Sequence, residues 1–73
     1  MADKTKTPAS IRKRQVVIEA IKAVAPQCKG NFEIPMSAIN YIEYGNRLRK
    51  EPIRASFNYV QSLTYEMLDK KII

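Results

Sequence analysis

Four polar side chains near the end of the chain have the types and the spacing of residues that read DNA bases. They are Arg54, Asn58, Gln61 and Tyr65. Their separations of four, three and four residues place them on one face of an α-helix. In the major groove, Arg suits guanine, and Asn and Gln suit adenine. The same pattern is also typical of the solvated face of an ordinary helix, so both interpretations stay open.

Two blocks of positive charge are the other residues with binding chemistry. Residues 1–14 hold five basic side chains against Asp3, and residues 47–54 hold four against Glu51. The rest of the chain is close to neutral, although the net charge is +6. Charge gathered in this way attracts polyanions, either nucleic acid or an acidic protein surface. The candidate partner-binding residues are Lys4, Lys6, Arg12, Lys13, Arg14, Arg47, Arg49 and Lys50.

Residue types needed for catalysis and metal binding are scarce. The chain has no histidine, so no side chain has an unperturbed pKa near neutrality. Its single cysteine, Cys28, has no second Cys or His with which to bind zinc. No GxSxG motif and no glycine-rich phosphate loop occurs. We therefore expect no enzymatic activity, no metal and no cofactor, and we expect Cys28 to be a small, partly buried residue.

The length and composition of the chain limit its architecture. Seventy-three residues make one domain with a thin core, and the hydrophobic content of 45% is ordinary for a globular protein. No apolar run reaches 18 residues, and no apolar signal segment follows the basic N-terminus. We expect a monomeric cytoplasmic protein without membrane contact.

The chain divides into an arm and a domain. Residues 1–9 are polar and charged, with no large apolar residue after Met1. They cannot bury enough surface to offset the entropy cost of ordering. We predict a disordered basic arm over residues 1–9 and a single small helical domain over residues 10–73.

The first helix is predicted to begin at Thr7-Pro8 or at Ser10, where a hydroxyl group can cap it. It should end near Ala25, because Pro26 restrains the residue before it. Its apolar stripe consists of Ile11, Ile18, Ile21 and Ala25, widened by Val17 and Val24.

Two short stretches follow this helix. Residues 27–31 are predicted to form a turn, with Gly30-Asn31 available for positive φ. The alternation of Phe32, Glu33 and Ile34 predicts a short extended segment that places Phe32 and Ile34 on the core.

Residues 35–50 admit two interpretations. One is a helix from Met36 to Tyr44, with Met36, Ile39 and Ile42 facing inward and Gly45 as a left-handed cap. The other shortens this helix and pairs residues 41–44 with residues 47–50 in a small hairpin around Gly45-Asn46. We favour the helix. In both cases Leu48 is expected to plug the core, because it is the only apolar residue between Asn46 and Pro52.

The last helix is predicted over residues 53–69, with Pro52 suited to its first turn. Its apolar residues recur at helical steps, and they are Ile53, Phe57, Val60, Leu63 and Met67. The fold class that follows is mainly α: a compact three-helix, helix-turn-helix-like bundle with a short extended segment or small hairpin. Its expected core is Ile18, Ile21, Ile39, Phe57 and Val60. The connection over residues 45–51 is longer than the 3–4 residues of a helix-turn-helix unit.

The overall format resembles one known family. The size, the opening sequence MADKTKTPASIRKRQ and the helical remainder are similar to the small transcription regulators of lytic Xanthomonas phages. The resemblance implies a protein that binds the RNA polymerase of the host in the bacterial cytoplasm, inhibiting initiation or promoting antitermination. It also implies that the arm and the nearby basic residues touch a polymerase subunit.

Two other functions stay open. The first is a helix-turn-helix-like DNA-binding regulator that reads bases with the helix over residues 53–69. The second is RNA or ribosome binding through the basic blocks, although the tyrosines do not form a stacking platform at sheet spacing. Tyr59 is expected to pack partly into the core, and Tyr41, Tyr44 and Tyr65 to lie on the surface.

Overall fold

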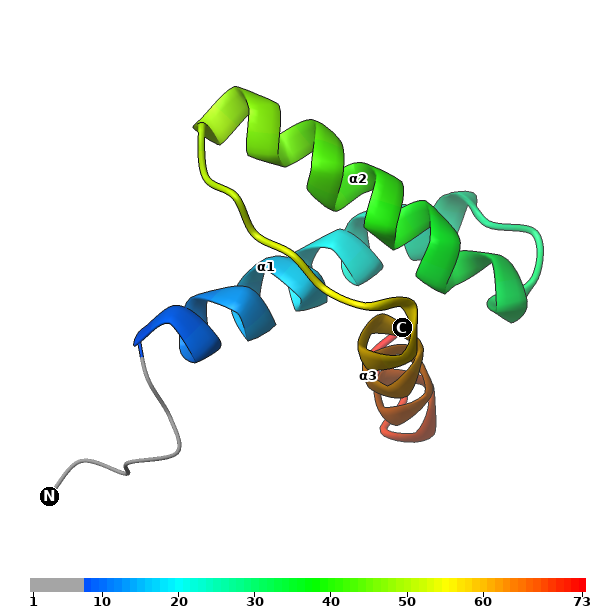
Figure 1. The fold of residues 1–73 in the computed structure, drawn as a ribbon. Helices are drawn as coiled ribbons and strands as arrows, with labels where there is room; N and C mark the ends of the chain where they lie inside the picture. Colours follow the sequence, from blue (N-terminus) through cyan, green and yellow to red (C-terminus); the bar gives the residue numbers. More distant parts are fainter. Residues whose placement is uncertain (1–7) are drawn as a thin grey trace, which may run out of the picture.

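Three α-helices account for most of residues 8–73, the part of the chain that the computed structural model describes. They are α1 (Pro8–Val24), α2 (Ile34–Arg49) and α3 (Phe57–Asp69). Two short 3₁₀-helices, η1 (Ala25–Gln27) and η2 (Asn31–Glu33), connect α1 to α2. α1 and α2 pack against each other, and α3 lies at an angle to both (Figure 1). The mainly α, three-helix fold predicted from the sequence is confirmed.

α1 follows the sequence closely. It begins at Pro8 and gives way to η1 at Ala25, immediately before Pro26, as the proline rule predicts. The last two residues of the predicted arm, Pro8 and Ala9, therefore belong to the helix. The rest of that arm lies outside the described residues.

The core is built from one apolar face of each helix. The largest fully buried apolar side chains of this core are those of Ile21, Val17, Val60 and Pro35. Ile18 and Ile39 pack against it and are only partly buried, whereas Ile11 is exposed. The buried hydrophobic residues are Val16, Val17, Ala20, Ile21, Val24, Ile34, Ala38, Ile42, Val60, Leu63 and Met67.

The predicted extended segment over residues 32–34 is wrong. The N–H of Glu33 donates to the carbonyl oxygen of Gly30 at 3.0 Å, which turns the chain into η2. Ile34 is buried as the first residue of α2, but Phe32 is exposed. The chain bends at residues 29–30, but Gly30 is extended, with φ −135°, and Asn31 has no positive φ, so the positive φ predicted there is wrong.

α2 runs past the C-terminal end that either interpretation predicted for it. The hairpin and the cap at Gly45 are wrong, because the helix runs to Arg49 and Lys50 closes it with φ 57°. Gly45 is buried inside the helix, and a Cβ atom there would meet the Arg49 guanidinium. The buried face of α2 follows Ile34, Ala38, Ile42 and Gly45. Leu48 falls beside this face and is exposed, as is Met36; neither is the core residue that the sequence predicted.

α3 starts four residues later than predicted. Ser56 caps it, since its Oγ accepts a hydrogen bond from the N–H of Tyr59 at 3.2 Å. Pro52 therefore precedes the helix, and Ile53 packs on the core from the connection. Val60, Leu63 and Met67 are buried as predicted.

Phe57 is not the core residue that the sequence predicted. As the first residue of α3, it leaves 41% of its surface exposed. Thr64 is buried on the face of α3 that packs on the core, and its hydroxyl donates to the carbonyl oxygen of Val60 at 2.8 Å. The buried hydroxyl is thus satisfied within its own helix.

Truncation of Leu63 should destabilise the protein far more than truncation of Phe57. Leu63→Ala should lower the free energy of unfolding by about 3–5 kcal/mol, because it empties a packed site. Phe57→Ala should cost only about 1–2 kcal/mol, since the ring is incompletely buried. Urea unfolding followed by circular dichroism measures both, with the exposed Tyr65→Ala as the control. Equal losses for Leu63→Ala and Phe57→Ala would contradict this facing of α3.

Candidate functional site

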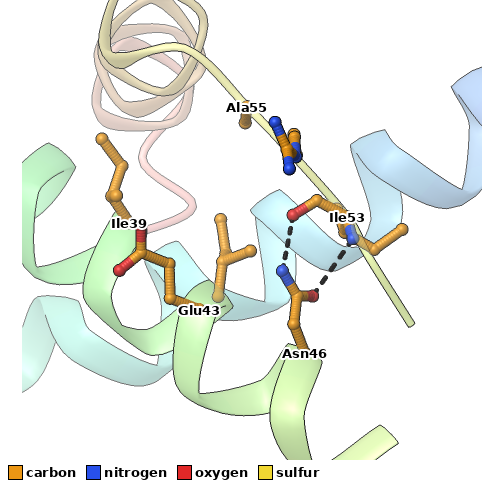
Figure 2. A pocket seen from close by; sticks show the side chains of 7 residues that line it. Ile39, Glu43, Asn46, Ile53 and Ala55 are labelled. Carbon is orange, nitrogen blue, oxygen red and sulfur yellow. Dashed lines mark hydrogen bonds between the residues drawn. The ribbon is translucent and has the colours of Figure 1, made fainter. Parts of the chain in front are cut away.

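The connection between α2 and α3 is fixed by the side chain of Asn46. Its Nδ2 donates to the carbonyl oxygen of Ile53 at 2.7 Å, and its Oδ1 accepts from the N–H of Ile53 at 3.2 Å (Figure 2). The amide thus pairs with both backbone groups of Ile53. The carbonyl oxygen of Asn46 also accepts the N–H of Glu51 at 3.2 Å. One residue of α2 therefore sets the path of the chain toward α3.

This path separates Arg54 from the other candidate base-reading residues. Arg54 is exposed on the connection and borders a hollow of about 350 Å³ between α2 and residues 53–55 (Figure 2). Asn58, Gln61 and Tyr65 do share one face of α3, at separations of three and four residues. The structure therefore brings together three of the four residues predicted to face DNA.

Glu51 joins the two basic blocks. Arg12 of α1 donates to both of its carboxylate oxygens, from Nε at 3.0 Å and from Nη2 at 3.1 Å. Arg49 donates from Nε to Oε1 at 3.2 Å. Hydrogen bonds from Arg12 have the largest effect on the pKa of Glu51, and they hold it below its ordinary value against desolvation, which raises it. The charge of Arg12 and the contacts with Arg49 lower this pKa further. Two guanidinium groups thus meet at one carboxylate, and the surface around it stays positive.

The next two basic residues of α1 contact α3. The Nζ of Lys13 lies 4.7 Å from the centroid of the Tyr59 ring, within the range of a cation–π interaction. Arg14 Nη2 lies 3.6 Å from Glu66 Oε2, and Lys70 Nζ lies 2.9 Å from the same oxygen. The hydrogen bond from Lys70, with help from Arg14, lowers the pKa of Glu66. Lys13 and Arg14 therefore also help to hold α3 against α1.

The end of α2 carries two of the basic residues that the sequence predicted to bind a partner. Arg47 and Lys50 are exposed, and neither forms an ion pair within residues 8–73. Lys4 and Lys6 lie outside the described residues. Of the predicted partner-binding residues, the structure thus gathers Arg12 and Arg49 at Glu51, with Arg47 and Lys50 in the same stretch of chain.

Sequence reasoning missed three residues that shape the candidate site, which are Asn46, Glu51 and Ser56. Glu51 had a signal, because it is the only acidic residue between Tyr44 and Tyr65 and stands inside a basic block. Ser56 had the signal of a capping residue before an apolar run. Asn46 had none that would single out Ile53 as its partner.

Other expectations concern single residues. Cys28 is partly buried against the core, as predicted, and so is Tyr59. Tyr41, Tyr44 and Tyr65 are exposed, as predicted. Among residues 8–73, no three Cys, Asp or Glu side chains are grouped so that they could hold a metal ion. Within the same range, every helix is too short or too polar to cross a membrane.

Comparison of the chain with protein family models, with curated proteins and with solved structures found no match.

Loss of the Asn46 amide should free the connection. We expect Asn46→Ala to lower the free energy of unfolding by about 1–3 kcal/mol, since it leaves the partly buried carbonyl oxygen of Ile53 without its partner. It also leaves the Ile53 N–H with one hydrogen bond, at 2.9 Å to the carbonyl oxygen of Glu51. Hydrogen exchange at the Ile53 amide should accelerate at the same time. The matched control is Asn40→Ala, an exposed asparagine of the same helix, which should change neither quantity. An unchanged exchange rate at Ile53 in Asn46→Ala would show that other contacts hold the segment.

Acidification should remove the stabilising effect of Glu51. The pKa of this carboxyl group is lowered in the folded protein. Its contribution to the free energy of unfolding is therefore complete above the pKa that a glutamate has in the unfolded chain, about 4.3. It is lost as the pH falls through the folded pKa. Wild type should therefore be more stable than Glu51→Gln at about pH 7, and the gap should shrink below about pH 4.5. Urea unfolding across this range measures the gap.

The control for this experiment is Glu43→Gln, which alters an exposed carboxylate that forms no ion pair within residues 8–73. A gap between wild type and Glu51→Gln that stays constant down to about pH 3 would contradict the role of the Arg12–Glu51 pair.

Proposed function

We propose that this chain is a small transcription regulator that acts by binding alone, and that it binds an acidic surface of a bacterial RNA polymerase. The observation that carries the proposal is the meeting of Arg12 and Arg49 at Glu51. It makes one surface out of two basic blocks that are far apart in the sequence. We call this the basic surface, and define it as Arg12, Arg47, Arg49 and Lys50.

The charge of the basic surface suits an acidic partner. Arg12 and Arg49 share one carboxylate, that of Glu51, and Arg47 and Lys50 are exposed and form no ion pair within the described residues. An excess of charge of this kind steers an oppositely charged partner and fixes its orientation. Arg12 and Arg49 are held in place by their shared carboxylate, so less of their side-chain freedom is lost when a partner binds.

The choice of RNA polymerase rests on the resemblance of the sequence to small phage regulators. Inhibition of initiation or antitermination would follow if the bound chain occupies a polymerase surface that these steps use. Lys4 and Lys6 are expected to take part as well.

The composition of α3 favours a protein partner over DNA. A helix in the major groove of DNA runs between two phosphate backbones. Lys and Arg side chains supply most of the attraction to these phosphates. α3 contains no Lys or Arg, and it carries Glu66 and Asp69 in its second half. Residues 50–56 also form a longer connection than the turn of a helix-turn-helix unit. The exposed Asn58 and the partly buried Gln61 would thus meet bases without the phosphate contacts that position a reading helix.

Reversal of the two unpaired cations should weaken polymerase binding. The double variant Arg47→Glu/Lys50→Glu should bind purified RNA polymerase about tenfold or more weakly, because like charges then face each other across the contact. Asn58→Ala/Gln61→Ala should bind as wild type does. The matched control is Lys22→Glu/Lys71→Glu, which makes the same change of net charge at exposed residues elsewhere. Fluorescence anisotropy with labelled chain measures all four proteins.

The same proteins are titrated against duplex DNA of random and of selected sequence. Base-selective binding that depends on Asn58 and Gln61, with a steep loss of affinity between about 50 and 200 mM salt, would assign the chain to DNA. That result, together with no binding to polymerase, would overturn the proposal.

A further inference from the structure

α2 has a second apolar face that nothing in residues 8–73 covers. Tyr41, Tyr44 and Leu48 follow one another at steps of three and four residues, so they are neighbours on the helix surface. Their exposed fractions are 46%, 63% and 68%. We call these three residues the outer stripe. They lie off the buried face of α2, which contains Ala38 and Ile42.

The outer stripe differs from scattered surface residues. A single exposed apolar side chain is normal, but these three form a continuous row on a chain with few large side chains in its core. Tyrosine and arginine are the residue types enriched where binding energy concentrates at protein interfaces. Arg47 follows Tyr44 by three residues and therefore borders the row.

The charges beside the outer stripe indicate what can cover it. Arg47 and Lys50 form no ion pair within the described residues. Glu43, the acidic residue of α2, is one position before Tyr44, about 100° around the helix from it. A partner surface with acidic residues around an apolar groove would complement both the row and its border. A second copy of the chain would not, because it offers the same row with the same positive border and no acidic residue in that row.

We propose that the outer stripe is the apolar half of a protein-docking surface, and that it inserts into an acid-rimmed apolar groove of the partner. The arrangement is a helix laid in a groove, with anchors at steps of three and four residues. Arg47 belongs both to the border of the stripe and to the basic surface, so one partner would contact the two together. This inference rests on the proposed function in taking RNA polymerase as that partner.

Truncation of the outer stripe tests the inference, since exposed side chains can be shortened with little effect on folding. Tyr44→Ala and Leu48→Ala should each weaken binding to purified RNA polymerase core enzyme about tenfold, as truncation of an interface anchor does. The dependence of affinity on salt should stay as in wild type, because no charge is removed. Thermal melts should be unchanged.

Matched controls come from other faces of the molecule. Tyr65→Ala shortens a tyrosine of α3 that is 50% exposed, and Met36→Ala shortens an exposed residue of α2 that lies off the outer stripe. Both should bind polymerase as wild type does. A loss of affinity in these controls equal to that of the stripe variants would overturn the inference.

The outcomes separate the two proposals. Full binding by Tyr44→Ala and Leu48→Ala, with weak binding by Arg47→Glu/Lys50→Glu, overturns the outer stripe and supports the proposed function. Weak binding by the stripe variants alone supports the stripe and overturns the role of the basic surface. Failure of wild type to bind polymerase overturns both. Self-association of wild type in sedimentation velocity that Leu48→Ala abolishes would make a second copy the occupant, and would overturn the inference too.

Discussion

The fold depends on one side-chain amide, which forms hydrogen bonds with backbone groups as a neighbouring β-strand would. Asn46 pairs with the N–H and the carbonyl oxygen of Ile53, and so satisfies a connection that has no regular secondary structure. Because Ile53 is held there, its side chain packs on the core and Glu51 lies within reach of Arg12. The approach to α3 and the joining of the two basic blocks therefore both depend on Asn46, together with the hydrogen bond from the Ile53 N–H to the carbonyl oxygen of Glu51.

Helical periodicity predicted what depends on local sequence. α1, with its end before Pro26, and the buried row of Val60, Leu63 and Met67 follow from it. The start of α3 does not, because Ile53 and Phe57 continue the apolar period of the helix while neither is one of its buried residues. Ile53 is apolar because it packs on the core from the connection, and periodicity alone does not separate that role from a place in the helix. The cap at Ser56 decides where α3 begins.

The candidate site was predictable as charge and not as geometry. The two basic blocks are visible in the sequence, but their meeting at Glu51 depends on a contact across 39 residues. The signal at Gly45-Asn46 was misleading for a related reason. Both residue types favour turns locally, yet in the fold Gly45 makes room for Arg49 and the Asn46 amide binds Ile53. Tertiary contacts override the local preference at both positions.

At the end of α2, the residue that best fits the backbone conformation differs from the residue that supplies a positive charge. Lys50 adopts φ 57°, a backbone conformation that costs a residue with a Cβ atom about 1–2 kcal/mol and costs glycine nothing comparable. Glycine would thus make the helix end easier to form, but it would remove a cation from the rim of the basic surface. The chain carries lysine there and accepts a strained backbone in a domain with little stability to spare. Position 50 affects both the stability of the fold and the proposed binding. A sequence redesigned for stability alone would therefore lose part of the surface proposed to bind the partner.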